Sequence, residues 1–154
     1  MALVYMSLGT NLGNRHNNML TAIALLSERV GKILALSALY ETEPWGFESE
    51  NTFLNVALSM ETEFQPMELL SITQDVEQEM GRTAKSNGSY QDRLIDIDLL
   101  TYDQLIWESP ILVLPHPLMH EREFVLKPLV EIAPDLVHPI LNKTMSQLYD
   151  RLHC

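Results

Sequence analysis

The chain has little cysteine and little positive charge. Cys154, the last residue, is the only cysteine among 154 residues, so an intrachain disulfide and a cysteine-rich metal site are both excluded. Ten Lys and Arg residues stand against 21 Asp and Glu, which gives a formal net charge of −11. This balance argues against nucleic acid as a partner. A small anionic ligand stays compatible with it, provided that basic residues or metal ions gather locally.

Long apolar runs are also missing. No stretch approaches the roughly 20 apolar residues that a membrane-spanning helix needs, and no basic region precedes the apolar N-terminus as in a signal peptide. We therefore expect a cytoplasmic protein with no membrane partner. A hydrophobic content of 46% and the modest length favour one domain with its own core, spanning residues 1–154.

Apolar residues recur with the periods of strands and helices in a regular order. Strands are expected near 4–8, 33–42, 54–60 and 94–102. One helix is expected before Gly31 and another from Pro66 to Gly81. Shorter segments with further helices near 122–132 and 145–152 follow. The order β-α-β-β-α-β predicts an α+β, ferredoxin-like fold, in which an antiparallel sheet carries two helices on one face, with a C-terminal extension.

Two aspartates stand in an otherwise apolar run, RLIDIDLL, at residues 93–100. Because side chains alternate along a strand, Asp96 and Asp98 share one face and Ile97 points to the other. Two carboxylates about 6–7 Å apart repel each other, and a divalent cation between them reverses the sign of that interaction. Mg²⁺ binds one or two carboxylates together with water and substrate phosphates. The alternative for D-x-D alone is a half-buried strand with one wet face.

Other polar and aromatic side chains are candidates for the same site as this pair of aspartates. Phe53 and Asn55 are expected on the non-core face of the third strand, where a ring could stack on a flat ligand and an amide could read its edge. Gln74 and Glu77 lie three residues apart on the second helix. The alternatives are surface packing for the first pair and a solvated helix face for the second.

Basic residues flank the aspartate strand in the sequence. Arg82, Lys85, Arg93 and Arg122 are four of the ten in the chain. A metal-bound polyphosphate needs such donors, because charge builds up on the transferring oxygens.

Two histidines offer a second kind of site. His116 and His120 have the spacing of helical zinc motifs, which makes a zinc hydrolase one alternative. However, H-E-x-x-H is absent and Pro117 lies between the two histidines. A single histidine beside a phosphate group is the favoured interpretation.

Six segments together match one known family in content and in order. They are SLGTNLGNR, SALYETEPWG, FLNVAL, TQDVEQEMGR, DRLIDIDLL and LPHPLMHEREFVLKPLVEIAPDLVHP. In these segments the chain resembles the 6-hydroxymethyl-7,8-dihydropterin pyrophosphokinase family of folate biosynthesis. The resemblance implies that a pyrophosphoryl group passes from ATP to the hydroxymethyl group of the pterin, releasing AMP, with two Mg²⁺ bound. It implies a cleft on the sheet face that the two helices leave open. A ferredoxin-like module that binds a nucleotide or pterin without chemistry is the alternative.

The resemblance also implies roles for individual residues. The expected catalytic residues are Arg82, Arg93 and the two metal ligands Asp96 and Asp98. The expected pterin-binding residues are Thr42, Pro44, Trp45, Phe53, Asn55 and Phe124, with the two phenylalanines enclosing the ring. The expected nucleotide-binding residues are Gln74, Glu77, Leu99, His116 and Arg122.

The chain departs from the family pattern in one loop, which is expected to close over the site. Ala84 stands where many members have a second arginine, and Gln91 and Asp92 replace a Gly-Pro pair. Lys85 substitutes for the missing arginine only in part, because an ammonium group lacks the guanidinium fork.

By resemblance, the chain is expected to be a monomer.

Overall fold

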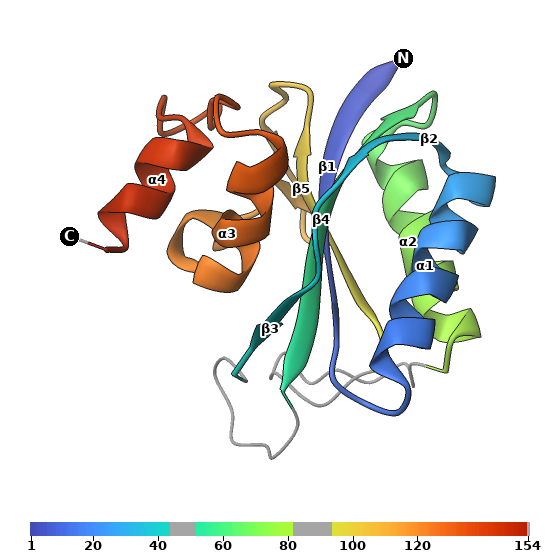
Figure 1. The fold of residues 1–154 in the computed structure, drawn as a ribbon. Helices are drawn as coiled ribbons and strands as arrows, with labels where there is room; N and C mark the ends of the chain where they lie inside the picture. Colours follow the sequence, from blue (N-terminus) through green and yellow to red (C-terminus); the bar gives the residue numbers. More distant parts are fainter. Residues whose placement is uncertain (44–51, 82–93, 154) are drawn as a thin grey trace.

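The computed structural model describes residues 1–43, 52–81 and 94–153 (Figure 1). The strands are β1 (Ala2–Thr10), β2 (Gly31–Leu36), β3 (Tyr40–Thr42), β4 (Phe53–Thr62), β5 (Asp96–Tyr102), β6 (Trp107–Glu108) and β7 (Val113–Leu114). The helices are α1 (Arg15–Arg29), α2 (Pro66–Glu79), α3 (Glu123–Ile132) and α4 (Met145–Arg151), with a 3-10 turn at Met119–Glu121. Among these described residues, no helix has the length and apolar character needed to cross a membrane.

The main sheet is antiparallel, with the strand order β2-β4-β1-β5 and the short strand β3 also paired to β4. Helices α1 and α2 lie together on one of its faces (Figure 1). The expected mixture of helices with an antiparallel sheet is therefore confirmed. The prediction of a single strand over 33–42 is wrong, because the structure divides this segment into β2 and β3 around Ser37. Here the Ser37 hydroxyl accepts the hydrogen bond of the Ala57 N–H at 2.9 Å, in place of a backbone carbonyl.

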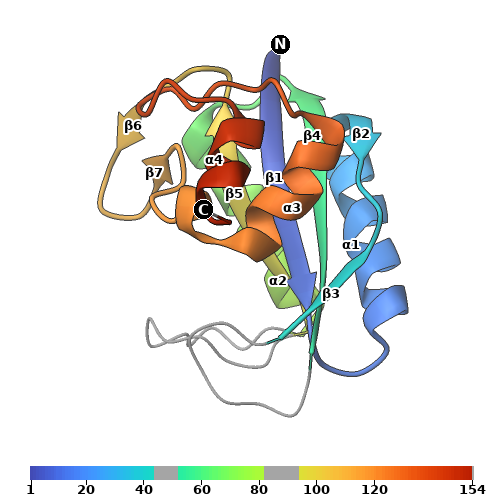
Figure 2. The same cartoon turned by 60° about the vertical axis from the view of Figure 1, so that its left-hand side comes forward.

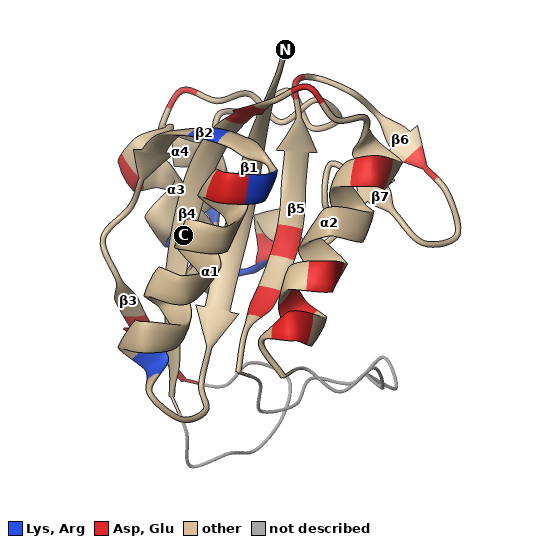
Figure 3. Cartoon of the chain, turned by 90° about the vertical axis from the view of Figure 1, so that its right-hand side faces the viewer, with Lys and Arg blue, Asp and Glu red and all other residues tan. Residues whose placement is uncertain are grey.

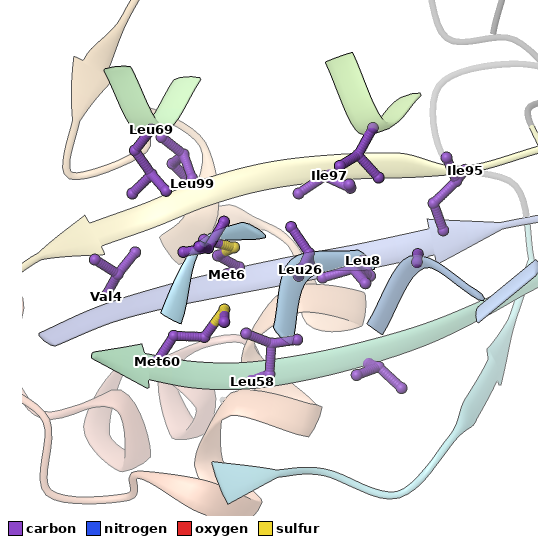
Figure 4. Close-up of a cluster of buried hydrophobic side chains, with 14 of the residues drawn as sticks. Val4, Met6, Leu8, Leu26, Leu58, Met60, Leu69, Ile95, Ile97 and Leu99 are labelled. Atoms are coloured by element: carbon purple, nitrogen blue, oxygen red, sulfur yellow. The ribbon is translucent and has the colours of Figure 1, made fainter. Parts of the chain in front are cut away.

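The larger core lies between the sheet and the α1–α2 layer. Val4, Met6 and Leu8 alternate along β1 and are fully buried, as the period of two predicts. Figure 4 shows them facing Leu26 of α1 and Leu69 of α2. This arrangement directs the side chains between them, including Ser7 and Gly9, to the opposite face of the sheet.

The C-terminal extension covers part of that opposite face (Figures 1 and 2). A second apolar cluster forms there between the sheet and α3 and α4. Its buried members are Ala57, Leu100, Met119, Val125, Leu126, Leu129, Met145 and Leu148. Among the described residues, α3 borders the remaining part of this face, near the end of β1 and the starts of β4 and β5.

His138 makes hydrogen bonds to the backbone inside the C-terminal extension. It is buried, and its Nδ1 accepts hydrogen bonds from the backbone N–H groups of Ile140 (3.2 Å) and Leu141 (3.1 Å). Burial lowers the pKa of His138, and the nearby His120 lowers it further. A protonated Nδ1 could no longer accept either hydrogen bond, so the fold needs the neutral ring.

We expect the His138 ring to lower the free energy of unfolding of the protein in mild acid. Because the pKa of His138 is lower in the folded chain than its ordinary value of 6.5, the unfolded chain takes up the proton first. The stabilisation is present above pH 6.5 and is lost as the pH falls toward the folded-state pKa. Urea unfolding of wild type and His138→Asn across this range should show a flatter pH profile for the variant, since asparagine keeps an acceptor and does not titrate.

His16→Asn is the matched control, because His16 is an exposed residue of α1. Its pH profile should follow that of the wild type. Equal slopes for His138→Asn and the wild type would show that His138 does not contribute to acid destabilisation.

Candidate active site

A cavity of about 430 Å³, measured with its opening to solvent, lies on the sheet face opposite α1 and α2. The described residues that line it are Ser7, Gly9, Thr42, Glu43, Phe53, Asn55, Asp96, Asp98, Arg122 and Phe124. They come from β1, β3 and the residue after it, β4, β5, and the N-cap and first turn of α3. Seven of them belong to the expected site, so segments far apart in the sequence converge here.

The strand register explains why these side chains meet. Gly9 of β1 is paired with Asp96 on one side and with Asn55 on the other. Partners across antiparallel strands share a face, so a carboxylate, a glycine and an amide form one row. A Cβ at Gly9 would lie 3.2 Å from Asn55 Oδ1 and 3.4 Å from the Phe53 ring. A side chain at this position would therefore crowd the Asn55 amide and the Phe53 ring and would take up space on the cavity floor.

The carboxylate end carries both signs of charge. Asp98 is the partner of Ser7 in the next row toward the sheet centre, and Arg122 Nη1 lies 3.8 Å from Asp98 Oδ2. Only 4% of Arg122 is exposed, and burial lowers its pKa to about 10. The guanidinium therefore stays charged at neutral pH. Figure 3 shows how strongly acidic the surroundings are, with Asp and Glu along both β5 and α2.

The donor set of this end suits a hard cation. Asp96 and Asp98 supply carboxylate oxygens from one strand face, and Mg²⁺ binds such a pair while keeping water and phosphate ligands. Zinc sites usually need three or four protein ligands. In residues 1–43, 52–81 and 94–153, no group of three or more His, Cys, Asp or Glu side chains is placed to hold a metal ion. The residues present fit Mg²⁺ better than they fit zinc.

The opposite end of the cavity combines an amide with two aromatic rings. Asn55 is buried, and its Nδ2 donates to Thr42 Oγ1 at 2.6 Å and, more weakly, to the Tyr40 carbonyl at 3.4 Å. Its Oδ1 consequently faces Gly9 and the cavity floor, where it can accept from an N–H group of a ligand. Phe53 and Phe124 border the same space. A flat heterocycle with a hydrogen-bonding edge fits these contacts.

The expected nucleotide-binding residues on α2 and β5 differ in burial. Gln74 is exposed, whereas Glu77 is only 3% exposed and accepts a hydrogen bond of 2.7 Å from the Ile97 N–H. That bond satisfies an outward donor of β5, which lies at one edge of the described sheet, just behind the aspartates. The Leu99 side chain packs beside Leu69 in the core (Figure 4). Contact between Leu99 and a nucleotide would thus involve backbone atoms.

The two histidines considered for zinc have different partners. The His116 N–H donates to the Leu100 carbonyl at 2.8 Å, and its Nδ1 accepts from the Leu118 N–H at 3.1 Å. Burial lowers the pKa of His116, while the charge of Asp96 acts in the opposite direction. The His120 ring meets the His138 ring edge-on, with centroids 6.0 Å apart. The structure thus brings His116, rather than a histidine pair, to the side of the carboxylates.

Several expected residues lie outside the described ranges. They are Pro44, Trp45, Arg82 and Arg93, together with the loop residues Ala84, Lys85, Gln91 and Asp92.

The structure adds Ser7, Gly9 and Glu43 to the cavity. The first two carried a signal in the sequence, because alternation along the first strand places them opposite Met6 and Leu8. Glu43 carried none, since its position depends on how β3 meets β4. Arg15 was missed in the same way. Its Nη1 lies 2.8 Å from Thr52 Oγ1 and 3.1 Å from a Glu41 carboxylate oxygen, so α1 supports the edge of the cavity.

Comparison with known proteins connects this geometry with a family. Residues 5–134 match the model of 7,8-dihydro-6-hydroxymethylpterin-pyrophosphokinase (HPPK). The chain is 52% identical over 143 residues to 2-amino-4-hydroxy-6-hydroxymethyldihydropteridine pyrophosphokinase of Porphyromonas gingivalis, covering 90% of this chain and 95% of that protein. It is 40% identical over 147 residues to the protein of the same name from Aquifex aeolicus, covering 96% and 90%.

A solved structure shows the same fold at low identity. The chain superposes on HPPK-DHPS of Plasmodium falciparum with a TM-score of 0.79 and 17% identity, covering 97% of this chain and 44% of that one. The chain thus spans less than half of that larger protein. Because the family model covers most of its length and relatives align almost end to end, the chain belongs to the 7,8-dihydro-6-hydroxymethylpterin-pyrophosphokinase family.

Proposed function

We propose that the cavity is the site at which this chain, an ATP-dependent pyrophosphokinase of folate biosynthesis, transfers the pyrophosphoryl group of ATP to the hydroxymethyl group of 6-hydroxymethyl-7,8-dihydropterin. The products are AMP and the pterin diphosphate. One observation carries the proposal. A carboxylate pair with a buried arginine and an amide with two aromatic rings share one sheet face, with only small residues between them. A phosphate end and a heterocycle end thus lie in one cavity, with Gly9 between Asp96 and Asn55 in the strand register.

The heterocycle end determines how the pterin lies. In this proposal Phe53 and Phe124, which line the cavity, stack on its ring, and Asn55 Oδ1 accepts from its N–H edge. Thr42 keeps the Asn55 amide in this orientation by accepting from Nδ2. An amide held in advance loses little rotamer freedom when the substrate binds.

The phosphate end screens the charge of ATP. Asp96 and Asp98 would hold Mg²⁺, two ions by resemblance to the family, and the metal would neutralise charge on the phosphate oxygens. Arg122 adds a positive group that solvent does not screen, since it is almost completely buried. The chain's part in the reaction is to align the hydroxyl oxygen with the β-phosphorus and to stabilise charge that develops there.

The finer points of architecture are also proposals. The strand order β2-β4-β1-β5 and the pair of helices on one face support a ferredoxin-like arrangement within a single domain over residues 1–154. The positions of Gln74, Glu77, Leu99 and His116 around β5 agree with a nucleotide on that side. A monomer and a cytoplasmic location stay predictions.

The decisive experiment is an assay of AMP release from ATP and Mg²⁺, with and without 6-hydroxymethyl-7,8-dihydropterin. We expect AMP only when the pterin is present, and none after EDTA is added. Binding of both ligands without AMP would instead support the non-catalytic module. Activity that survives EDTA would contradict the role of the aspartates.

We expect Phe124→Ala to raise the KM for the pterin about 10- to 100-fold, because stacking of a base on an aromatic ring contributes about 1–3 kcal/mol. The KM for ATP should change far less. Steady-state kinetics with each substrate varied in turn measures both. Phe53→Tyr is the matched control, because it keeps a ring at the other wall of the cavity and should leave both constants within about twofold. Normal pterin binding by Phe124→Ala would show that Phe124 does not stack on the substrate.

A further inference from the structure

The heterocycle end of the cavity is held in part by β3, which is a very short strand. It has three residues, and within the described part of the sheet it is paired with β4. Thr42, its last residue, accepts from Asn55 Nδ2 at 2.6 Å, and the Tyr40 carbonyl lies 3.4 Å from the same nitrogen. The orientation of the Asn55 amide therefore depends on where β3 lies. So short a strand needs further contacts to keep its place.

Glu131 of α3 supplies such contacts. Its two carboxylate oxygens each lie 3.1 Å from the Ala38 backbone nitrogen, and Oε1 lies 2.5 Å from the Tyr40 hydroxyl. Hydrogen bonds to an ionised carboxylate are stronger than neutral ones. Lys127, one turn earlier on α3, places its Nζ 5.6 Å from the centroid of the Tyr40 ring. The hydrogen bond to Glu131 raises the pKa of Tyr40, so the phenol remains a donor.

The same helix carries the opposite wall of the cavity. Arg122 is the N-cap of α3, and Phe124 lies in its first turn. Glu131 lies near the end of the helix, about 10 Å along the axis from Phe124 at 1.5 Å per residue. α3 lies on the sheet face that holds the cavity (Figure 2). A link from Glu131 to β3 therefore fixes the two walls relative to each other.

We propose that Glu131 is a positioning residue for the pterin. By accepting hydrogen bonds from the Ala38 N–H and the Tyr40 hydroxyl, it holds β3 against α3 and so keeps Thr42 and Asn55 at a fixed distance from Phe124. Glu131 itself does not line the cavity. This role rests on the proposed function, in which the pterin occupies that end of the cavity.

The test uses Glu131→Gln and Tyr40→Phe in the full chain, with the pterin and ATP varied in turn in the AMP assay. Each variant weakens the link without emptying a core position, since Glu131 is exposed and Tyr40 half-exposed. We expect the KM for the pterin to rise about five- to tenfold, the size of effect that corresponds to the net loss of one ordinary hydrogen bond. kcat and the KM for ATP should stay within about twofold. Because both substitutions act on the bond between Glu131 and the Tyr40 hydroxyl, their effects should be less than additive in the double variant.

Asp135→Asn is the matched control. It is another exposed carboxylate, just beyond the end of α3, and should behave as wild type. An unchanged pterin KM in both variants would overturn the positioning role. So would a rise in both KM values with a lowered melting temperature, which would indicate a merely structural contact.

The wild type tests the proposed function separately. If it released no AMP in response to the pterin, the proposed function would fail. The ratio of pterin dissociation constants between the variants and the wild type, measured by calorimetry, would then decide the positioning role alone.

Discussion

Asp96→Asn should lower kcat for pterin-dependent AMP release by about 10²–10³-fold, the range found when one group that stabilises transition-state charge is removed. Asparagine has the shape of aspartate, and the row that joins Asp96, Gly9 and Asn55 should remain. What is lost is one negative charge facing the phosphate end. The remaining carboxylate, Asp98, binds a divalent cation more weakly by itself. A higher Mg²⁺ concentration should therefore recover part of the lost rate.

The measurement is a titration of initial rate against Mg²⁺ for both proteins, with a thermal melt to confirm the fold. Asp135→Asn, the exposed control used above, should follow the wild-type curve. A rate for Asp96→Asn near that of the wild type at every Mg²⁺ concentration would exclude Asp96 as a metal ligand.

Arg122→Ala is expected to have an effect of similar size on kcat/KM for ATP, again about 10²–10³-fold. The guanidinium is buried and lies 3.8 Å from Asp98. Its removal would leave only carboxylates, those of Glu43, Asp96 and Asp98, among the described charged groups that line the cavity. Repulsion of a polyanionic substrate should dominate the loss. The KM for ATP should rise more than the KM for the pterin.

Arg122→Lys separates charge from shape. Lysine keeps the positive charge without the fork of donors. We expect kcat/KM for ATP in this variant to lie about tenfold below that of the wild type. Because alanine at a buried position can also destabilise the fold, the lysine variant and a melting curve are both needed. If lysine and alanine gave the same loss while both variants melted normally, the donor geometry of Arg122, rather than its charge, would be the essential property.

The local features of this protein were predictable because their causes are local. Alternation along one strand was enough to place Asp96 and Asp98 on the face opposite Ile97. The same rule placed Phe53 and Asn55 away from the third strand's core residues. The glycine after α2 was also predictable, since Gly81 adopts a positive φ of 102° at the helix end.

Features that depend on distant partners could not be predicted in this way. The division of the second strand follows from the bond between Ser37 and Ala57 of β4. Glu77 is buried because β5 is an edge strand with an outward N–H group at Ile97, and helical spacing contains no such information. The contacts of Glu131 depend on how the extension folds back onto the sheet.

The register of β5 also has a consequence for how this site can vary. Asp98 and Leu99 are paired with β1 in regular succession, but Leu100 is skipped, and pairing resumes between Thr101 and Tyr5. The bulge shifts which side chains of β5 point to each face of the sheet. The half that bears the carboxylates and the half under the C-terminal extension therefore present their side chains independently. Substitutions that repack the extension against Leu100 need not rotate the aspartates. The aspartate pair and the packing of the helices beside it can therefore change independently, although one continuous strand carries both.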